Sequence, residues 1–410
     1  MISLARPSVP VVVALALLAT AAPRAQQVLP RVEPASIGLA PDALADATRL
    51  LERFVAEGKI AGAVAAIAKD GKVGYLTAVG VQDLESRTPM TPRSLFRIYS
   101  MTKAVTAVAV MQLRDEGRFR LDDPVSNACP SSPTCGGGTA RCATPRPPSH
   151  AITIEDLLLH TSGLSHRTSD LYRTLGVRDR TDTLTTFVRK ITKAPLMEDP
   201  HTRFRYSEAT TVLGRLVEIW SGQPFDRYLA ARVLQPLGMS DTVFWVEGDR
   251  ATRLATVYGP GPDGRLARVE PEVVPFTTKP TLLEGAVGLV SSVPDFLRFS
   301  QMLLDGGVLG GVRVLKAETA ARMVKNGLSP DELASRGGPR GWGLGNVDVL
   351  VAPDGTGAPL GEYGWDGTAG TIFWNDPVAK TSIVLMTQSM PANPDRLRQQ
   401  FKALAARAIR

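Results

Sequence analysis

The sequence predicts an α+β fold in which a β-sheet carries an inserted, mostly helical region. Residues 60–80 and residues 370–389 each have the pattern of two strands joined by a turn, whereas the residues between them have the pattern of helices and loops. Strands at both ends of a chain around a helical middle are typical of this fold class. With 410 residues, the chain can bury a large core as one big domain or two smaller ones.

The N-terminus has the pattern of a secretory signal peptide. One arginine, Arg6, precedes an apolar run from Val11 to Ala19, and small residues follow up to Ala25. The run is too short to span a bilayer, and this order of segments is typical of a cleaved export signal. We therefore expect residues 1–25 to be a signal peptide and the protein to be exported, either periplasmic or secreted. No cysteine closely follows the apolar run, so we expect no lipid-modified membrane anchor.

Hydrophobic spacing and turn residues predict the other elements in chain order. Apolar residues at helical spacing predict a helix at about 41–57, and Asp70-Gly71 predicts the turn of the first strand pair. The same signals predict a short helix followed by a turn within 152–164, a strand turn at 375–380 and a final helix from about Pro394.

A helix predicted from about Phe96 to Gly117 carries an unexpected cation. The stretch FRIYSMTKAVTAVAVMQLRDEG is apolar nearly all round, which predicts burial on every side, yet its first turn contains Ser100 and Lys103. A lysine at this end is locally unfavourable by up to about 1 kcal/mol, because the N-terminus of a helix is itself positive. Residues three apart share a helix face, so a desolvated Lys103 amine can take the proton of the Ser100 hydroxyl. We therefore predict a nucleophile and its base at the start of this helix.

A cysteine-bearing insertion follows at residues 127–150. It contains Cys129, Cys135 and Cys142 in a stretch rich in Pro, Gly and Ser, which predicts a surface loop. In an oxidising compartment two of the three thiols can pair and leave one free. A zinc site with His150 as a fourth ligand is the alternative, but a disulfide-tied loop is favoured because the spacing is not that of a zinc site.

Composition argues against several classes of protein. Hydrophobic residues make up 44% and charged residues 21% of the chain, as in ordinary globular proteins. The net charge of +7 is spread among interleaved acids and bases, and aromatics do not alternate with basic runs, so nucleic-acid binding has little support.

Other catalytic patterns are absent from the sequence. It has no G-x-S-x-G nucleophile elbow and no H-E-x-x-H metal motif, and the GWGLGN stretch at Gly341 lacks the strand–turn–helix context of a dinucleotide site. The four histidines have no metal-ligand pattern, and we expect His160 to make a structural hydrogen bond at a helix end.

With these alternatives set aside, SMTK at Ser100 resembles the Ser-x-x-Lys signature of the serine β-lactamase and penicillin-binding protein superfamily. Four further stretches resemble landmarks of its class C-like branch, which includes the family VIII carboxylesterases, and they occur in the expected order. They are DLLLHTSGL at 156–164, FRYSEATTVLGRLVE at 204–218, GAVGLVSSVPDFLRFSQMLLDGG at 285–307 and GWDGTAGTIFWNDP at 364–377.

The second motif of that superfamily is Tyr-x-Asn, and YSE places Tyr206 at the tyrosine position. By resemblance, Tyr206 shares the general-base role with Lys103 and later protonates the leaving group. Which of the two is the neutral base stays open, because such close groups titrate together. Glu208 replaces the asparagine that helps to hold a substrate amide, which makes amide substrates less suitable.

The third motif, Lys-Thr-Gly, corresponds to Trp365-Asp366-Gly367, followed by Thr368. Loss of the lysine removes the charge that would attract a substrate carboxylate, and Trp365 offers an apolar wall in its place. Strand alternation would turn Asp366 away from the pocket, where it would otherwise repel anions. By resemblance, the backbone N–H groups of Ser100 and Thr368 form the oxyanion hole.

The resemblance implies a β-lactamase/transpeptidase-like fold, with an antiparallel sheet flanked by helices and a mostly helical region. We expect one serine hydrolase domain at 26–410, with sheet regions at about 26–95 and 275–410 and a helical region at about 96–274. The expected activity is hydrolysis of small carboxylic esters through an acyl-enzyme on Ser100, without metal or other cofactor. The expected substrate-binding residues are Trp365, Asp366, Gly367 and Glu208. The alternatives are a β-lactamase or D-Ala-D-Ala carboxypeptidase, an acyltransferase, and, more remotely, a penicillin-binding sensor without turnover.

Overall fold

The computed structural model describes residues 29–128, 150–270 and 276–409 and has the predicted α+β architecture. Its centre is an eight-stranded sheet with the order β10-β11-β12-β13-β14-β1-β2-β3, in which all neighbouring strands are antiparallel. Its strands are β1 (Gly62–Lys69), β2 (Lys72–Asp83), β3 (Thr88–Pro89), β10 (Arg340–Gly343), β11 (Val347–Leu350), β12 (Tyr363–Asp366), β13 (Ile372–Asp376) and β14 (Thr381–Thr387). Because β1 pairs with β14, the two predicted strand pairs lie side by side although they are far apart in sequence.

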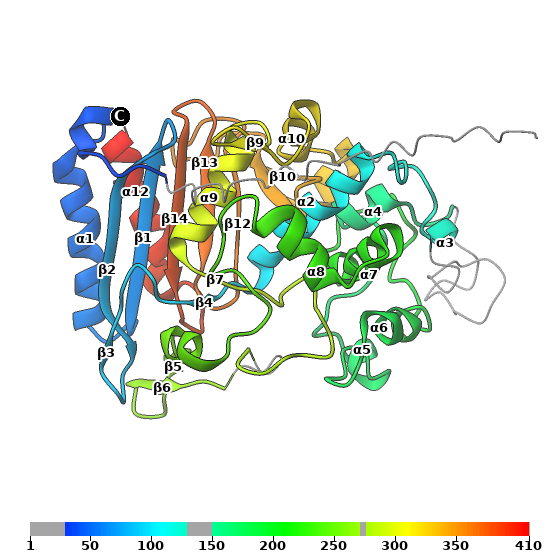
Figure 1. Ribbon diagram of the computed structural model, residues 1–410, viewed down its shortest axis with the longest axis horizontal. Helices are drawn as coiled ribbons and strands as arrows, with labels where there is room; N and C mark the ends of the chain where they lie inside the picture. Colours follow the sequence, from blue (N-terminus) through cyan, green and yellow to red (C-terminus); the bar gives the residue numbers. More distant parts are fainter. Residues whose placement is uncertain (1–28, 129–149, 271–275, 410) are drawn as a thin grey trace, which may run out of the picture.

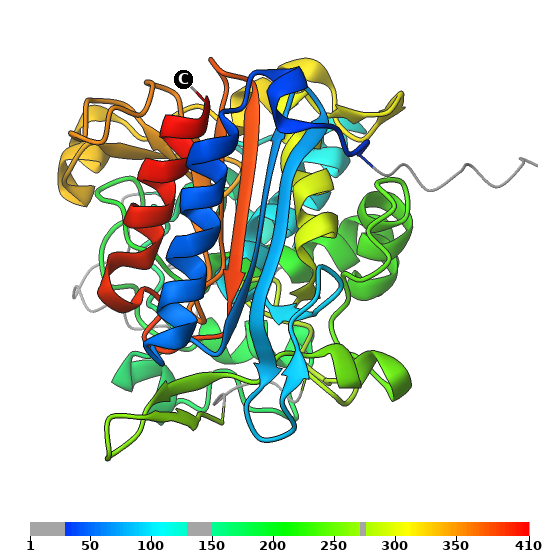
Figure 2. The same cartoon turned by 90° about the vertical axis from the view of Figure 1, so that its left-hand side faces the viewer.

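Helices cover both faces of this sheet. On one face, α1 (Pro41–Ala56) and α12 (Leu397–Ile409) lie next to each other, as Figure 2 shows. On the other face, α9 (Val293–Leu304) packs against β14 and β1. Beyond α9 lies the helical region (Figure 1), which contains α2 (Thr102–Asp115), α4 (Ile154–Leu159), α5 (Asp170–Thr174), α6 (Leu184–Ile191), α7 (Ala209–Ser221) and α8 (Phe225–Leu229).

The alternation of side chains along β1 explains why both faces are covered. Val64, Ala66 and Ala68 belong to the core on the α9 side, whereas Ala63, Ala65 and Ile67 belong to the core under α1 and α12. Successive strand residues point to opposite faces, so a strand that is apolar at every position needs helices on both sides.

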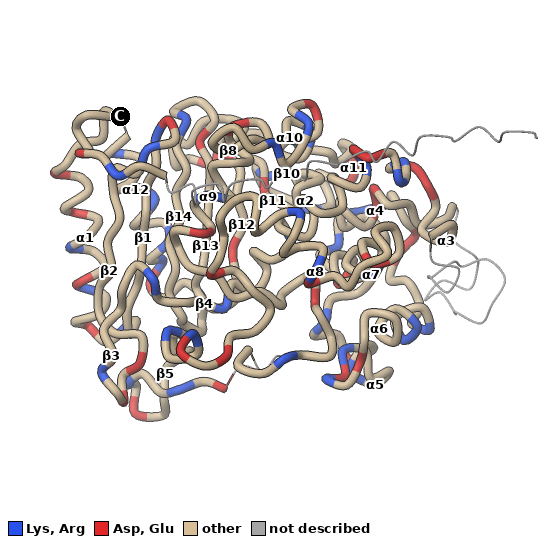
Figure 3. Tube along the Cα trace, viewed as in Figure 1, with Lys and Arg blue, Asp and Glu red and all other residues tan. Residues whose placement is uncertain are grey.

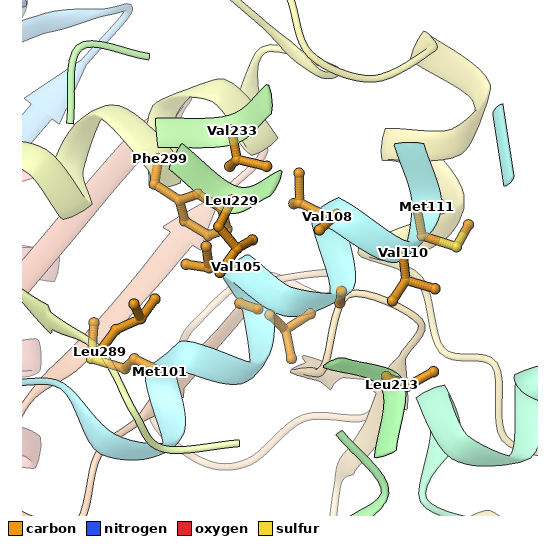
Figure 4. Close-up of a cluster of buried hydrophobic side chains, with 14 of the residues drawn as sticks. Met101, Val105, Val108, Val110, Met111, Leu213, Leu229, Val233, Leu289 and Phe299 are labelled. Carbon is orange, nitrogen blue, oxygen red and sulfur yellow. The ribbon is translucent and has the colours of Figure 1, made fainter. Parts of the chain in front are cut away.

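Helix α2 is buried on every side, as its sequence predicts. Its residues from Thr102 to Leu113 are all buried, and its apolar side chains meet Leu213 of α7, Leu229 of α8 and Phe299 of α9 (Figure 4). Its start differs from the prediction, because Phe96–Arg97 form strand β4 and residues Tyr99–Met101 form a single 3-10 turn before α2 begins. The physical reason is that β4 pairs with β7 (Val290–Ser291), a ladder too short to show a period in the sequence.

The expected division into sheet and helical regions is therefore only approximate. The expected helical region also holds β5 (Tyr258–Pro260) and β6 (Leu266–Arg268), which pair with each other. The expected C-terminal sheet region also holds α9, α10 (Ala317–Met323) and α11 (Pro330–Arg336).

Some predictions fall outside the described residues. The signal peptide at 1–25 and the three cysteines of the insertion lie there, so export and cysteine pairing stay predictions. Within the described ranges, none of the helices has the length and apolar character needed to cross a bilayer. Acidic and basic residues are interspersed over the described chain (Figure 3), in agreement with the interleaved charges of the sequence.

Candidate active site

The backbone around Ser100 is held in an unusual conformation. Tyr99 has a φ of 42°, a left-handed value that costs a bulky residue of order 1–3 kcal/mol and tends to persist at functional sites. The Tyr99 ring is buried and meets Phe276 edge-on at 5.8 Å, and β4 fixes the chain just before it. These contacts position Ser100 in the 3-10 turn that precedes α2, where the residue is 9% exposed.

Lys103 lies one turn further along and is almost fully buried. Its Nζ donates a hydrogen bond to the Ala286 carbonyl at 3.1 Å and lies 4.5 Å from the centre of the Tyr206 ring. Burial lowers the pKa of Lys103 to about 7, so a large share of the amine is neutral near neutral pH. The Lys103 amine, whose position at the start of the helix is unfavourable for a cation, is therefore a group that can accept a proton.

Tyr206 brings the second motif to the same place. The Ser100 hydroxyl lies within hydrogen-bond reach of its phenol oxygen, which also accepts a hydrogen bond from Trp365 Nε1 at 3.2 Å. Its ring packs among His160, Trp342 and Trp365 at centroid distances of 4.8, 5.9 and 5.4 Å. Burial raises the pKa of Tyr206, so its resting form is the neutral phenol.

Glu208 belongs to a buried group of charges next to Lys103. Its Oε2 accepts a hydrogen bond from Thr211 at 2.9 Å. Burial alone would raise the pKa of Glu208, but the charges of Arg178, Lys103 and Arg167 outweigh it and lower that pKa. Glu208 also acts on Lys103, because its negative charge raises the pKa of the buried amine; its substrate-binding role stays a prediction.

A second buried glutamate completes the group. Arg178 Nε donates to Glu284 Oε1 at 2.5 Å, and burial raises the pKa of Glu284. The next residue, Gly285, lies between α2 and α7, where its carbonyl accepts from Thr106 at 2.7 Å. A Cβ there would lie 2.7 Å from the Thr210 carbonyl oxygen, so this close approach requires glycine.

The end of β12 lies against the backbone that precedes Ser100. A Cβ on Gly367 would lie 2.4 Å from the Ile98 carbonyl oxygen, so only glycine allows the two segments to approach this closely. Thr368 follows at this junction and is exposed. The structure therefore brings the segment expected to supply the second oxyanion N–H next to the segment that carries Ser100.

Asp366 does not join this group, in contrast to its place among the expected substrate-binding residues. Its carboxylate accepts from Arg398 Nη1 of α12 at 2.8 Å, on the opposite side of β12 from Trp365. The reason is the strand alternation noted in the sequence. Arg398 Nη2 also donates to the Gly367 carbonyl at 2.9 Å, so the ion pair supports the turn that carries Thr368.

His160 has the structural role that the sequence predicts. It ends α4 with a φ of 58°, and its Nδ1 accepts from the Ser207 backbone N–H at 3.2 Å. Complete burial lowers the pKa of His160 well below its ordinary value, so the ring stays neutral.

Sequence reasoning missed three side chains near Tyr206. His166 stacks on the Tyr206 ring at 5.9 Å, Arg167 contributes to the electrostatics of Lys103, and Trp342 meets Trp365 edge-on at 4.5 Å. Trp342 lies in the GWGLGN stretch that was set aside as a false dinucleotide pattern, and its Nε1 donates to the Leu158 carbonyl at 3.1 Å. Its indole in an otherwise glycine-rich strand was the available signal.

Taken together, the site offers a serine hydroxyl, a neutral phenol and a partly neutral amine at the positive end of a buried helix. Such a set can deprotonate the hydroxyl, stabilise an oxyanion and return the proton to a leaving group. This is the chemistry of acyl transfer.

Comparison with known proteins agrees with this chemistry. The Beta-lactamase family model matches residues 47–408. The chain is 34% identical over 355 residues to an uncharacterized protein of Mycobacterium tuberculosis, and the alignment covers 82% of this chain and 87% of that protein. It is 31% identical over 386 residues to Esterase EstB of Burkholderia gladioli, and the alignment covers 85% of this chain and 92% of the esterase. Among solved structures, EstCE1, a hydrolase with promiscuous acyltransferase activity, matches with a TM-score of 0.79 at 28% identity, over 89% of this chain and 99% of that chain.

Proposed function

The chain belongs to the Beta-lactamase family, whose members are serine hydrolases and their relatives, and we propose that it hydrolyses carboxylic esters through an acyl-enzyme on Ser100. The observation that carries the choice of esters is Trp365. It stands where β-lactamases and peptidases of this superfamily have a lysine, and its indole N–H donates to Tyr206. An apolar ring at that position gives no charge to a substrate carboxylate and suits an uncharged ester.

In the first step, neutral Lys103 receives the proton of Ser100 through the Tyr206 hydroxyl, and the Ser100 Oγ bonds to the ester carbonyl carbon. The oxyanion that forms accepts hydrogen bonds from the N–H groups of Ser100 and Thr368, each commonly worth about 3 kcal/mol. When the C–O bond to the alcohol breaks, Tyr206 returns a proton to the leaving oxygen. In the second step, water attacks the acyl-enzyme along the same proton path and releases the acid.

The relatives support this proposal. EstB is named an esterase and EstCE1 a hydrolase with promiscuous acyltransferase activity. The EstCE1 description also favours acyl transfer to an alcohol as a second candidate, because an alcohol can replace water in the second step without any change in the residues used.

The test compares a nitrophenyl butyrate with a chromogenic cephalosporin, using the purified protein and its Ser100→Ala variant. We expect the unsubstituted protein to hydrolyse the ester and the Ser100→Ala variant to lose this activity. For the unsubstituted protein, kcat/KM for the cephalosporin should be at least about 100-fold lower than for the ester. Rapid cephalosporin turnover would show that Trp365 does not exclude β-lactams. Stable acylation without turnover would support the sensor. If an added alcohol diverts most of the acyl product from acid to ester, acyl transfer is the main activity.

The pH dependence of kcat/KM follows from the buried amine. The active form of Lys103 is neutral, so the rate constant should rise as pH increases through about 7 and level off above that value. Substituting Glu208→Gln removes a negative charge that favours the ammonium form, so the midpoint should move to lower pH. Substituting Arg178→Gln removes a positive charge, so the midpoint should move to higher pH. Rate measurements from about pH 5 to 9 check this, and a flat profile would contradict Lys103 as the base.

A further inference from the structure

A cluster of three metal-ligating side chains includes Asp156 of α4 and shares no residue with the catalytic group. His150, Asp156 and His201 each present one ligand atom, and these three atoms all lie within 4.8 Å of one another. We infer that these residues bind one Zn²⁺ ion. The site is independent of the catalytic group and differs from the cysteine site considered in the sequence, because it combines His150 with residues outside the insertion.

Hydrogen bonds at the start of α4 hold the Asp156 carboxylate in an orientation suited to binding a cation. It is fully buried, and its Oδ2 accepts from the Thr153 backbone N–H and from the Thr153 hydroxyl, both at 2.8 Å. These bonds fix the carboxylate so that its Oδ1 faces His201 Nε2 at 3.3 Å. Oδ1 also accepts from the Thr161 hydroxyl at 2.9 Å, which leaves a second lone pair for a cation.

His201 is oriented from its backbone and from its other ring nitrogen. Its φ is 58°, and its backbone N–H donates to the Thr161 carbonyl at 3.0 Å. Its Nδ1 lies 3.3 Å from Glu332 Oε1, so the N–H on that nitrogen faces a carboxylate and Nε2 is left as the ligand atom. A carboxylate behind a histidine is the usual arrangement that fixes a zinc-binding imidazole.

His150 supplies the third ligand from the last residue of the insertion. Its ring stacks on the His201 ring at 5.1 Å with an interplanar angle of 30°. Two imidazole nitrogens and one carboxylate oxygen suit Zn²⁺, which accepts three protein ligands and a water, whereas Mg²⁺ and Ca²⁺ require mostly oxygen ligands. Binding would displace to solvent any proton held on His201 Nε2.

The position of the cluster indicates what the ion would do. Asp156 lies in the helix that ends at His160, whose carbonyl accepts from the Arg205 backbone N–H at 2.8 Å, next to Tyr206. A zinc ion at His150, Asp156 and His201 would tie the end of the insertion to this part of the fold. Because the ion would join segments that are apart in sequence, we expect its main effect on thermal stability.

The experiment treats the full protein with EDTA, removes the chelator and titrates it with zinc chloride in a calorimeter. We expect one Zn²⁺ to bind per chain and to raise the melting temperature. The His201→Gln and His150→Gln variants should lose both the binding and the rise in melting temperature. The matched control His166→Gln should bind zinc like the parent. Glu332→Gln keeps all three ligands and should bind about 10- to 100-fold more weakly, which keeps the test valid if a ligand variant fails to fold.

Cobalt distinguishes this site from one built on the cysteines. Co²⁺ bound by nitrogen and oxygen gives visible bands without the near-ultraviolet charge-transfer band of a thiolate ligand. A thiolate band, zinc binding that persists in a folded His201→Gln, or no saturable binding by the parent protein would each overturn the inference.

Discussion

The Lys103→Met variant is expected to lose about 10⁴-fold in kcat/KM for ester hydrolysis while it remains folded. Methionine fills a similar volume in the buried space beside Tyr206 but has no amine to accept the Ser100 proton. The Ala286 carbonyl loses its donor at 3.1 Å, a cost of about 1 kcal/mol that is offset because an amine no longer has to be buried. Steady-state kinetics and thermal unfolding of the variant and the parent measure the two effects separately.

The control for this prediction is Lys103→Arg. Arginine keeps a positive charge at the site, but its guanidinium does not lose a proton in the accessible pH range. If Lys103 acts as a base, both variants should be inactive. If it acts only by its charge, the arginine variant should retain much of the activity, and that result would contradict the mechanism.

The helices and strands that carry the site could be predicted where residues close together in the sequence form a helix, strand or turn pattern. Helix α2 is apolar on every side, and the first strand pair has an Asp-Gly turn, so both follow from spacing alone. The 3-10 turn at Tyr99 was not predictable, because it depends on the pairing of β4 with β7, which are nearly two hundred residues apart. For the same reason, a pattern in sequence could not reveal the Ala286 carbonyl as the partner of Lys103.

The buried charges around Lys103 show a second limit of sequence reasoning. Glu208 was visible as a departure from the Tyr-x-Asn motif, and its carboxylate was expected to face the substrate. The structure surrounds it with Arg178 and Arg167, and a second glutamate, Glu284, pairs with Arg178. The two glutamates raise the pKa of Lys103 and the two arginines lower it, while burial has the largest effect and brings that pKa to about 7.

The Tyr206→Phe variant should lose about 10³-fold in kcat for alkyl esters, with little change in KM. Phenylalanine keeps the ring contacts with His160, Trp342 and Trp365, so the site should keep its shape while the hydroxyl that passes the proton is lost. Tyr75→Phe is the matched control. It removes another buried hydroxyl, bonded to Thr48 at 3.0 Å on the α1 side of the sheet, and should leave kcat unchanged.

The leaving group of the substrate separates the two roles proposed for Tyr206. A nitrophenolate leaves without a proton, whereas an alkoxide needs one from Tyr206 as the C–O bond breaks. The loss in Tyr206→Phe should therefore be larger for alkyl esters than for nitrophenyl esters. An equal loss for both would mean that Tyr206 acts only in the deprotonation of Ser100, and the leaving group would then have to take its proton directly from Lys103.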